Sequence, residues 1–229
     1  MMSGRDESII GGSLATEEEV QREASAAMAA GARRFLILTN INKRSNIIMI
    51  LKTSFLYNVS VVVVGMVKAI ESVLKSIPGN VKLYWRGQEE QVRADGGFWI
   101  YVPNNDDPAC RGGDDAAKGK KNDLKLENVS DLLRRLNSSS EVKILGIEIP
   151  SSETQKKVTS LNSLPPLQTA TALMLGNEGS GMSPKQLSVC DDFVYIKQYS
   201  GDTASFNVAV AYGIVVHRLW AAATAAASS

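Results

Sequence analysis

The sequence predicts an α/β fold in which a parallel β-sheet carries helices on both faces. A short apolar run, RRFLILTNI, is followed by a segment with helical spacing, NIIMILKTSFLYN, and then by the β-branched run VSVVVVG, which ends at Gly65. Strand, helix and strand in this order are typical of a βαβ unit, whose two strands are parallel. The chain has 229 residues and 44% of them are hydrophobic, which is enough for the core of one domain.

The region before this unit is predicted to be helical. The segment from Thr16 to Ala32 opens with a Thr followed three residues later by Glu19, as in a capping box, and continues in strong helix formers. The region after the unit is less regular, because aromatic fragments alternate with Gly, Pro, Asn and charged residues between Ile77 and Asp123. We expect residues 103–123 to form an exposed loop.

Regular elements are expected again after this loop. They are a helix in ENVSDLLRRLN, a strand in EVKILGIEIP, a linker in SSETQKKVTSLNSLPPLQ, a strand in TATALML, a helix beginning near SPKQL, a strand in FVYIK, and a long helix from about Ser205 to Trp220. The tail AAATAAASS is of low complexity. We therefore expect one domain over residues 16–220, with flexible ends at residues 1–15 and 221–229.

Composition and charge exclude several classes of protein. The chain has 25 basic and 24 acidic residues, so binding to nucleic acid would need a local basic patch. Cys110 and Cys190 lie far apart without CxxC spacing, which argues against a zinc site or a disulfide framework and fits a reducing compartment. The pair Asp191-Asp192 has no His nearby, and we expect no metal site there. The start MMSGRDESIIGGSL resembles neither a signal nor a transit peptide, and no apolar run approaches the roughly 18 residues of a membrane span. We expect an intracellular protein, cytoplasmic or nuclear, without membrane contact.

A glycine-rich corner, LMLGNEGSGMS, follows directly behind the strand TATALML. Glycines let backbone amides converge on an anion, so such a corner is one way to bind phosphate. However, it lacks the Lys-Ser/Thr ending of a P-loop and the GxGxxG spacing of a dinucleotide fold, and Glu178 would repel phosphate. A tight turn with Asn and Gly at positive φ is an alternative that needs no ligand.

A second polar corner lies at the start of the final helix, in IKQYSGDTASFNVAVAYG. Asn207 stands two residues after Ser205, in the first turn of a helix whose next residues are small or apolar. Both corners follow predicted strands, and parallel sheets bind their ligands at the carboxyl ends of the strands. We therefore expect the two corners to share one site.

The two corners together resemble a known family. GNEGSG followed by an Ile-led loop and SFNVAVA resembles motifs two and three of the SpoU-type, or TrmH-like, RNA ribose 2′-O-methyltransferases of the SPOUT class. The segment from Asn46 to Ser54 resembles the first motif of that family, in which an Asn leads a helix that carries an Arg six residues on. The resemblance implies a C-terminal trefoil knot, S-adenosylmethionine as cofactor, and a homodimer that binds tRNA or rRNA, rather than DNA, at its interface.

The resemblance also implies roles for single residues. The cofactor would be held by Leu175, Gly176, Asn177, Gly181, Ile196 and Phe206. The ribose would be positioned, and its hydroxyl activated, by Asn46, Lys52, Glu178, Ser205 and Asn207. Lys43 and Arg44 precede the first motif and would contact RNA phosphates. Gly176 would be glycine because the backbone approaches the adenosyl group closely.

The sequence departs from the family at the residue expected to take the proton from the 2′-hydroxyl. Lys52 stands where the family has Arg, and the planar guanidinium and the ammonium are not interchangeable. Ile48 and Met49 are larger than the small residues usual there, and Lys197 replaces a Pro. Two alternatives stay open, namely a non-catalytic RNA-binding relative that keeps the fold and a nucleotide-binding protein of unrelated α/β fold. The final helix is apolar on nearly every face, which a core helix explains as well as a dimer helix, and we expect a homodimer.

Overall fold

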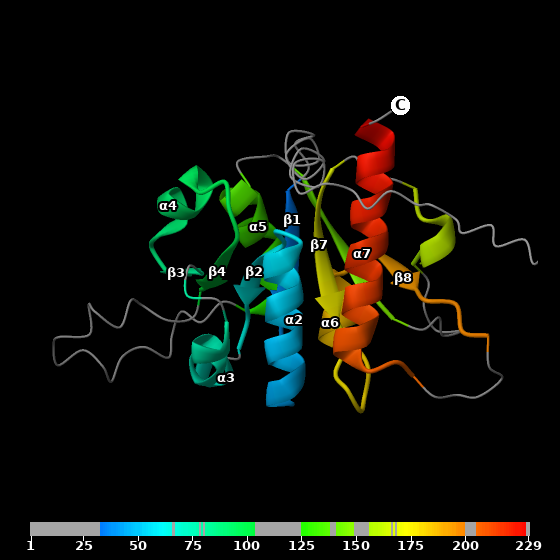
Figure 1. Cartoon of the computed structure of the whole chain (residues 1–229), viewed down its shortest axis with the longest axis horizontal. Coiled ribbons are helices and arrows are strands. Elements are labelled where there is room, and N and C mark those ends of the chain that lie inside the picture. Colours follow the sequence, from blue (N-terminus) through cyan, green and yellow to red (C-terminus); the bar gives the residue numbers. More distant parts are fainter. Residues whose placement is uncertain are drawn as a thin grey trace, which may run out of the picture.

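A parallel sheet of eight strands forms the centre of the computed structural model in the part of the chain that it describes (Figure 1). The described residues are 33–65, 67–77, 79, 81–103, 125–137, 141–148, 156–165, 167, 169–199 and 205–227. The predicted helix at residues 16–32, the segment 1–15 and nearly all of the predicted loop at 103–123 lie outside them.

Each strand of the sheet is parallel to its neighbours. The order is β3 (Lys82–Trp85), β4 (Trp99–Val102), β2 (Ser60–Val63), β1 (Arg34–Leu38), β7 (Ala170–Leu175), β5 (Val142–Ile147), β8 (Asp192–Tyr195) and β6 (Val158–Ser160). The predicted βαβ unit is confirmed, because β1 and β2 pair directly and α2 (Arg44–Leu56) joins them. β7 lies between β1 and β5, so the glycine-rich corner after β7 comes beside the segment that follows β1.

Helices cover both faces of the sheet, as the sequence predicted. α2, α3 (Val67–Val73) and α7 (Val208–Ala227) lie on one face, and Figure 1 shows α2 and α7 running side by side across it. The other face carries α4 (Glu89–Ala94), α5 (Val129–Asn137) and α6 (Pro184–Val189). Successive residues of a strand point to opposite faces, so Leu36 joins the core under α2 while Ile37 joins the core under α5.

Local sequence signals explain two of these helices. In α5 the buried residues recur at helical spacing and are Val129, Leu132, Leu133 and Leu136. α6 begins with a capping box, in which Ser183 Oγ accepts a hydrogen bond from the Gln186 amide and Gln186 Oε1 accepts one from the Ser183 amide at 2.9 Å. The buried Gln186 side chain also donates to the carbonyl of Leu175 at 2.8 Å, which fixes α6 against the end of β7.

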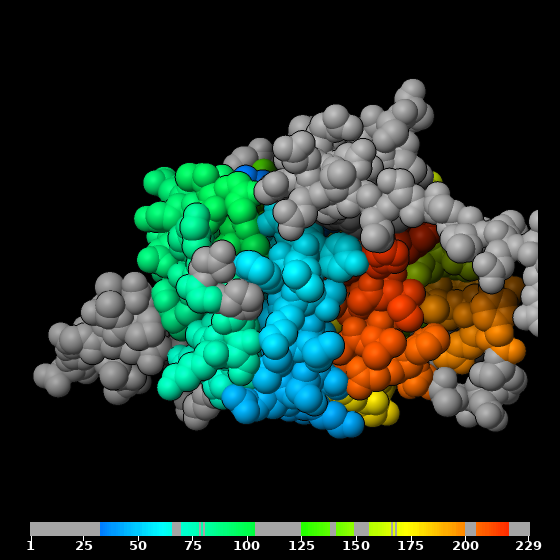
Figure 2. Space-filling view, in the orientation of Figure 1, coloured from blue at the N-terminus to red at the C-terminus, as the bar shows by residue number. Residues whose placement is uncertain are grey.

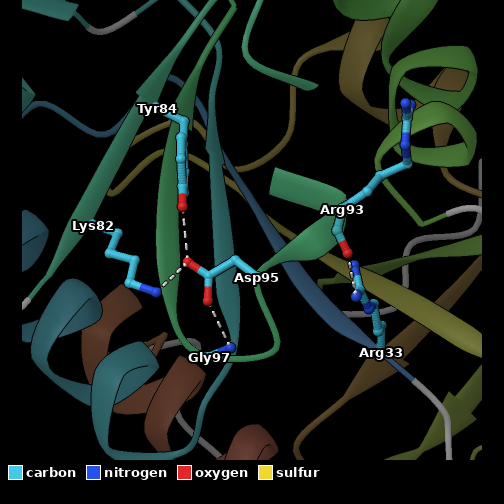
Figure 3. A network of polar contacts seen from close by, with 6 residues as sticks. All are labelled: Arg33, Lys82, Tyr84, Arg93, Asp95 and Gly97. Carbon is cyan, nitrogen blue, oxygen red and sulfur yellow. Dashed lines mark hydrogen bonds and ion pairs between the residues drawn. The ribbon is translucent and has the colours of Figure 1, made fainter. Parts of the chain in front are cut away.

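A polar network fixes the edge of the sheet at β3 and β4 (Figure 3). The Asp95 carboxylate, just after α4, accepts hydrogen bonds from Tyr84 Oη at 2.9 Å and the Gly97 amide at 3.0 Å, and pairs with Lys82 Nζ at 2.9 Å. Burial opposes ionisation of Asp95, but these donors outweigh it and hold the pKa of Asp95 below its usual value. Beside this network, Arg33 donates to the carbonyl of Arg93 at 3.1 Å, in the last turn of α4.

Several predicted boundaries were wrong. β3, α4 and β4 lie in the region where we expected little regular structure, and β6 lies inside the predicted linker. α3 lies before that region, in a segment for which no element was predicted. These elements are short, and β3 and β4 have only four residues each, so turn residues and charges dominate any sequence window that contains them. The final helix begins at Val208 and ends at Ala227, later at both ends than expected.

Candidate functional site

A pocket of about 230 Å³ lies at the carboxyl ends of β5, β7 and β8, beside the start of α7. All six residues that the sequence assigned to the cofactor line this pocket: Leu175, Gly176, Asn177, Gly181, Ile196 and Phe206. Glu178 and Ser205 line it as well. The structure therefore brings the two polar corners together at the edge where a parallel sheet is expected to bind a ligand.

The glycine-rich corner, residues 176–182, folds back on itself. Asn177 and Gly181 exchange two backbone hydrogen bonds of 2.8 and 3.1 Å, and Gly181 has a positive φ of 68°. Asn177 Oδ1 accepts from the Gly179 amide at 2.9 Å, while its Nδ2 donates to the carbonyl of Asn40 at 2.8 Å. The corner is thus a rigid turn attached to the segment after β1.

The reason that we predicted for Gly176 is incomplete. A Cβ at this position would lie 2.8 Å from the carbonyl carbon of Gly181 and 2.9 Å from the amide nitrogen of Met182. Both atoms belong to the backbone and cannot move without opening the turn. Glycine is therefore required at position 176 by the close approach of the turn to itself, whether or not a ligand is bound.

Glu178 joins the glycine-rich corner to the start of α2. Its Oε1 accepts hydrogen bonds from Asn46 Nδ2 at 3.0 Å and from the Lys43 amide at 3.1 Å, and the Asn42 amide lies 3.4 Å from its Oε2. Partial burial raises the pKa of Glu178, but these donors lower it further, so the pKa stays below its usual value. A carboxylate at a helix N-terminus also interacts favourably with the helix dipole.

Asn207 extends this connection to α7. Its Oδ1 accepts from the Ala209 amide at 2.9 Å, which caps α7, and its Nδ2 donates to Asn46 Oδ1 at 3.1 Å. Asn46 is only 5% exposed and uses both ends of its amide in this chain of contacts. The residues Asn207, Asn46 and Glu178 therefore tie the starts of α7 and α2 to the glycine-rich corner.

Three predicted site residues contribute no side-chain contact that the structure describes to this cluster. Lys52 is exposed on α2 and is absent from the described residues that line the pocket. The side chain of Arg44 donates to the carbonyl of Ser72 at 2.9 Å, so it contacts the end of α3. Lys43 is exposed, and its backbone amide binds Glu178. Met49 is 56% exposed on the outer side of α2, so its size does not narrow the pocket.

The structure adds one charged residue that the sequence reasoning missed. Glu148 directly follows β5 and lines the pocket, and its Oε2 accepts a hydrogen bond from the Met182 amide at 3.0 Å. Its position in the sequence could have indicated this, because Glu148 is a charged residue directly after the apolar run KILGI. The carboxyl end of a buried parallel strand lies at the edge of the sheet where ligands bind.

The surroundings of Cys190, Asp191 and Asp192 indicate structural roles for these residues. Burial raises the pKa of Cys190 to about 12, so its thiol stays protonated at neutral pH. Asp191 accepts from the Ile144 amide at 2.7 Å, and Asp192 pairs with Lys143 at 2.5 Å.

Within the described ranges, no three His, Cys, Asp or Glu side chains gather as metal ligands. No helix in the same ranges has the length and apolar character needed to cross a membrane.

Comparison with known proteins agrees with this architecture. The SpoU methyltransferase AviRb from Streptomyces viridochromogenes superimposes with a TM-score of 0.51 at 15% identity, over 85% of this chain and 61% of that one. The same protein in complex with the cofactor AdoMet gives 0.51 at 14% identity, over 83% of this chain and 58% of that one. This chain thus spans about three fifths of the AviRb structures, and no curated protein matched it. The family model described as the SpoU rRNA Methylase family matches residues 97–217, more than half of the chain. The chain belongs to the SpoU rRNA methylase family.

Proposed function

We propose that this protein transfers a methyl group from S-adenosylmethionine to a ribose 2′-hydroxyl of tRNA or rRNA. The observation that carries the proposal is the series of side-chain hydrogen bonds from Asn207 through Asn46 to Glu178. It joins residues of all three family motifs beside one pocket. Membership of the SpoU rRNA methylase family supports RNA as the substrate.

The pocket fits an adenosyl group in its chemistry. Ile196, Leu175 and Phe206 offer apolar walls for the adenine, and polar groups of the glycine-rich corner stand beside them. The fold relative AviRb is described in complex with AdoMet, which supports the same cofactor here. When bound, the cofactor would supply a methyl group on a positively charged sulfur.

Methyl transfer needs the ribose oxygen aligned with the methyl group and its proton removed, so the main contribution of the chain would be positioning. Ser205 at the pocket and Asn207 next to it would hold the ribose, while Asn46 and Glu178 fix the orientation of Asn207. Lys52 would act as the base. It is exposed on the outer side of α2, where RNA or a second subunit would dock.

We also propose a homodimer that associates through the outer sides of α2 and α7. These two helices lie side by side at the surface, as Figure 2 shows. Both have exposed large apolar residues. Among the described side chains, the exposed large apolar residues on them are Met49, Leu56, Val210 and Ile214. Lys52 lies on the same exposed side of α2, so association would bring it into an interface. The trefoil knot implied by the resemblance is a further proposal, supported by the insertion of β7 between β1 and β5.

The experiment combines binding and transfer with the full chain. Calorimetry should show binding of S-adenosylmethionine, and incubation with labelled cofactor and bulk RNA should yield 2′-O-methylated nucleosides after nuclease digestion. Lack of cofactor binding, or a label found only on bases, would contradict the proposal.

The second candidate is a non-catalytic RNA-binding relative. The exposed position of Lys52, outside the residues described around the pocket, favours it because no base is then held at the ribose. Cofactor binding without transfer by the wild type and by Lys52→Arg, together with RNA binding in a gel-shift assay, would support this candidate over the enzyme.

A further inference from the structure

Glu148 and Glu178 are the charged side chains among the described residues that line the pocket, and both are carboxylates. They come from different segments, since Glu148 follows β5 and Glu178 belongs to the glycine-rich corner. No Lys, Arg or His occurs among these lining residues. The charged side chains that line the pocket are therefore all negative, which favours a cationic ligand and disfavours a phosphate.

The two carboxylates are fixed at opposite ends of the glycine-rich corner. Glu178 is held at the start of α2 by the donors described above. Glu148 is held near the other end, where its Oε2 accepts from the Met182 amide at 3.0 Å and lies 3.1 Å from the position of a Cβ on Gly181. Because both side chains are held in place, their charges act on the pocket without reorganisation.

We propose that Glu148 makes the pocket selective for the sulfonium form of the cofactor over the neutral thioether product. This inference rests on the proposed function. S-Adenosylmethionine carries one more positive charge than S-adenosylhomocysteine, because methyl transfer converts the sulfonium into a neutral thioether. In a partly enclosed pocket the attraction between that charge and a carboxylate is stronger than in water. The cofactor is therefore bound more tightly than the product, which leaves after each transfer.

The test compares both ligands in the wild type and in Glu148→Gln. Glutamine keeps an oxygen that accepts the hydrogen bond from the Met182 amide, but it lacks the charge. Titration calorimetry of the full chain should show the affinity for S-adenosylmethionine falling about tenfold, whereas that for S-adenosylhomocysteine changes by less than about threefold. Added salt should weaken binding of S-adenosylmethionine more than that of the thioether in the wild type, and this difference should shrink in the variant.

Glu127→Gln is the matched control, because Glu127 is an exposed carboxylate paired with Lys125 and does not line the pocket. It should leave both affinities unchanged. Glu148→Asp keeps the charge, so it should keep the preference for S-adenosylmethionine even if both affinities fall. This second variant tests the inference if Glu148→Gln does not fold.

Two results would overturn the inference alone. The first is an equal change in both affinities in Glu148→Gln, which would mean that Glu148 only shapes the turn. The second is loss of the preference for S-adenosylmethionine over S-adenosylhomocysteine in Glu148→Asp. If the wild type binds neither ligand, the proposed function fails together with the inference, so the two failures are distinguishable.

Discussion

Asn46 donates a hydrogen bond to Glu178 over 3.0 Å, although 132 positions of sequence separate the two residues. The same amide accepts a hydrogen bond from Asn207 at 3.1 Å. One nearly buried side chain therefore connects the starts of two helices with the glycine-rich corner.

Replacing Asn46 with Ala should lower the free energy of unfolding by about 1–3 kcal/mol, because a hydrogen bond to a carboxylate is lost and Asn207 loses its acceptor. Chemical denaturation measures this change. Asn128→Ala is the control, since Asn128 is exposed at the end of a short 3₁₀ turn (Leu126–Asn128). Equal stability of the two variants would show that the amide chain contributes little.

The pH dependence of stability should carry a contribution from Glu178. Its pKa in the folded chain lies below the usual value of 4.5, so its ionised form stabilises the fold at neutral pH. This contribution disappears as the pH falls from that value through the lower folded-state pKa. The carboxylate is only partly buried, and we expect on the order of 1 kcal/mol or less. Urea denaturation at pH values from neutral to about 3 should show that the difference in the free energy of unfolding between wild type and Glu178→Gln becomes smaller as the pH falls. If this difference in the free energy of unfolding stays constant over the pH range, ionisation of Glu178 does not contribute to it.

Gly176→Ala should weaken both the fold and the binding of S-adenosylmethionine, because the new Cβ would meet the backbone of Gly181 at 2.8 Å. Gly96→Ala is the control, since Gly96 does not line the pocket and a Cβ there would have no atom within 4 Å. Melting temperature and calorimetry report the two effects. Loss of binding with an unchanged melting temperature would instead indicate that Gly176 is required only by the ligand.

Lys52→Arg should raise methyl transfer to bulk RNA by about 10² to 10⁴, because it restores the planar guanidinium that the motif resemblance implies at this position. Lys52→Ala should abolish transfer if Lys52 is the base. Lys52 is exposed, so both variants should melt near the wild-type temperature. Activity in the Ala variant equal to that of the wild type would remove Lys52 from the mechanism.

Val210→Glu should convert a dimer into a monomer, because Val210 is 51% exposed on the side of α7 that we propose as the interface. Light scattering should give twice the chain mass of 24.7 kDa for the wild type and the single mass for the variant. Gln91→Glu adds the same charge at an exposed position on α4, on the opposite face of the sheet, and should stay dimeric. A monomeric wild type at micromolar concentration would contradict the proposal.

Local patterns predicted the elements that show an apolar run or a helix start signal in the sequence. The run RFLIL became β1, and the helix expected to begin near SPKQL became α6. The same approach failed for β3 and β6, which lie at the two edges of the sheet and are mostly only partly buried, so neither forms a clear apolar run. Motif resemblance placed Gly176, Ile196 and Phe206, which line one pocket, but it gave no signal for Glu148.

The sequence by itself determined the class of fold, the family motifs and which residue types stand at the ends of the strands. Only the tertiary structure decided which of those residues meet. β7 pairs between β1 and β5, so Glu178 comes beside Asn46, and α7 packs against α2, so Asn207 completes the chain. The same packing leaves Lys52 on the exposed side of α2. Periodicity depends on neighbours a few residues apart, whereas these contacts depend on strand order and helix packing between segments more than a hundred residues apart.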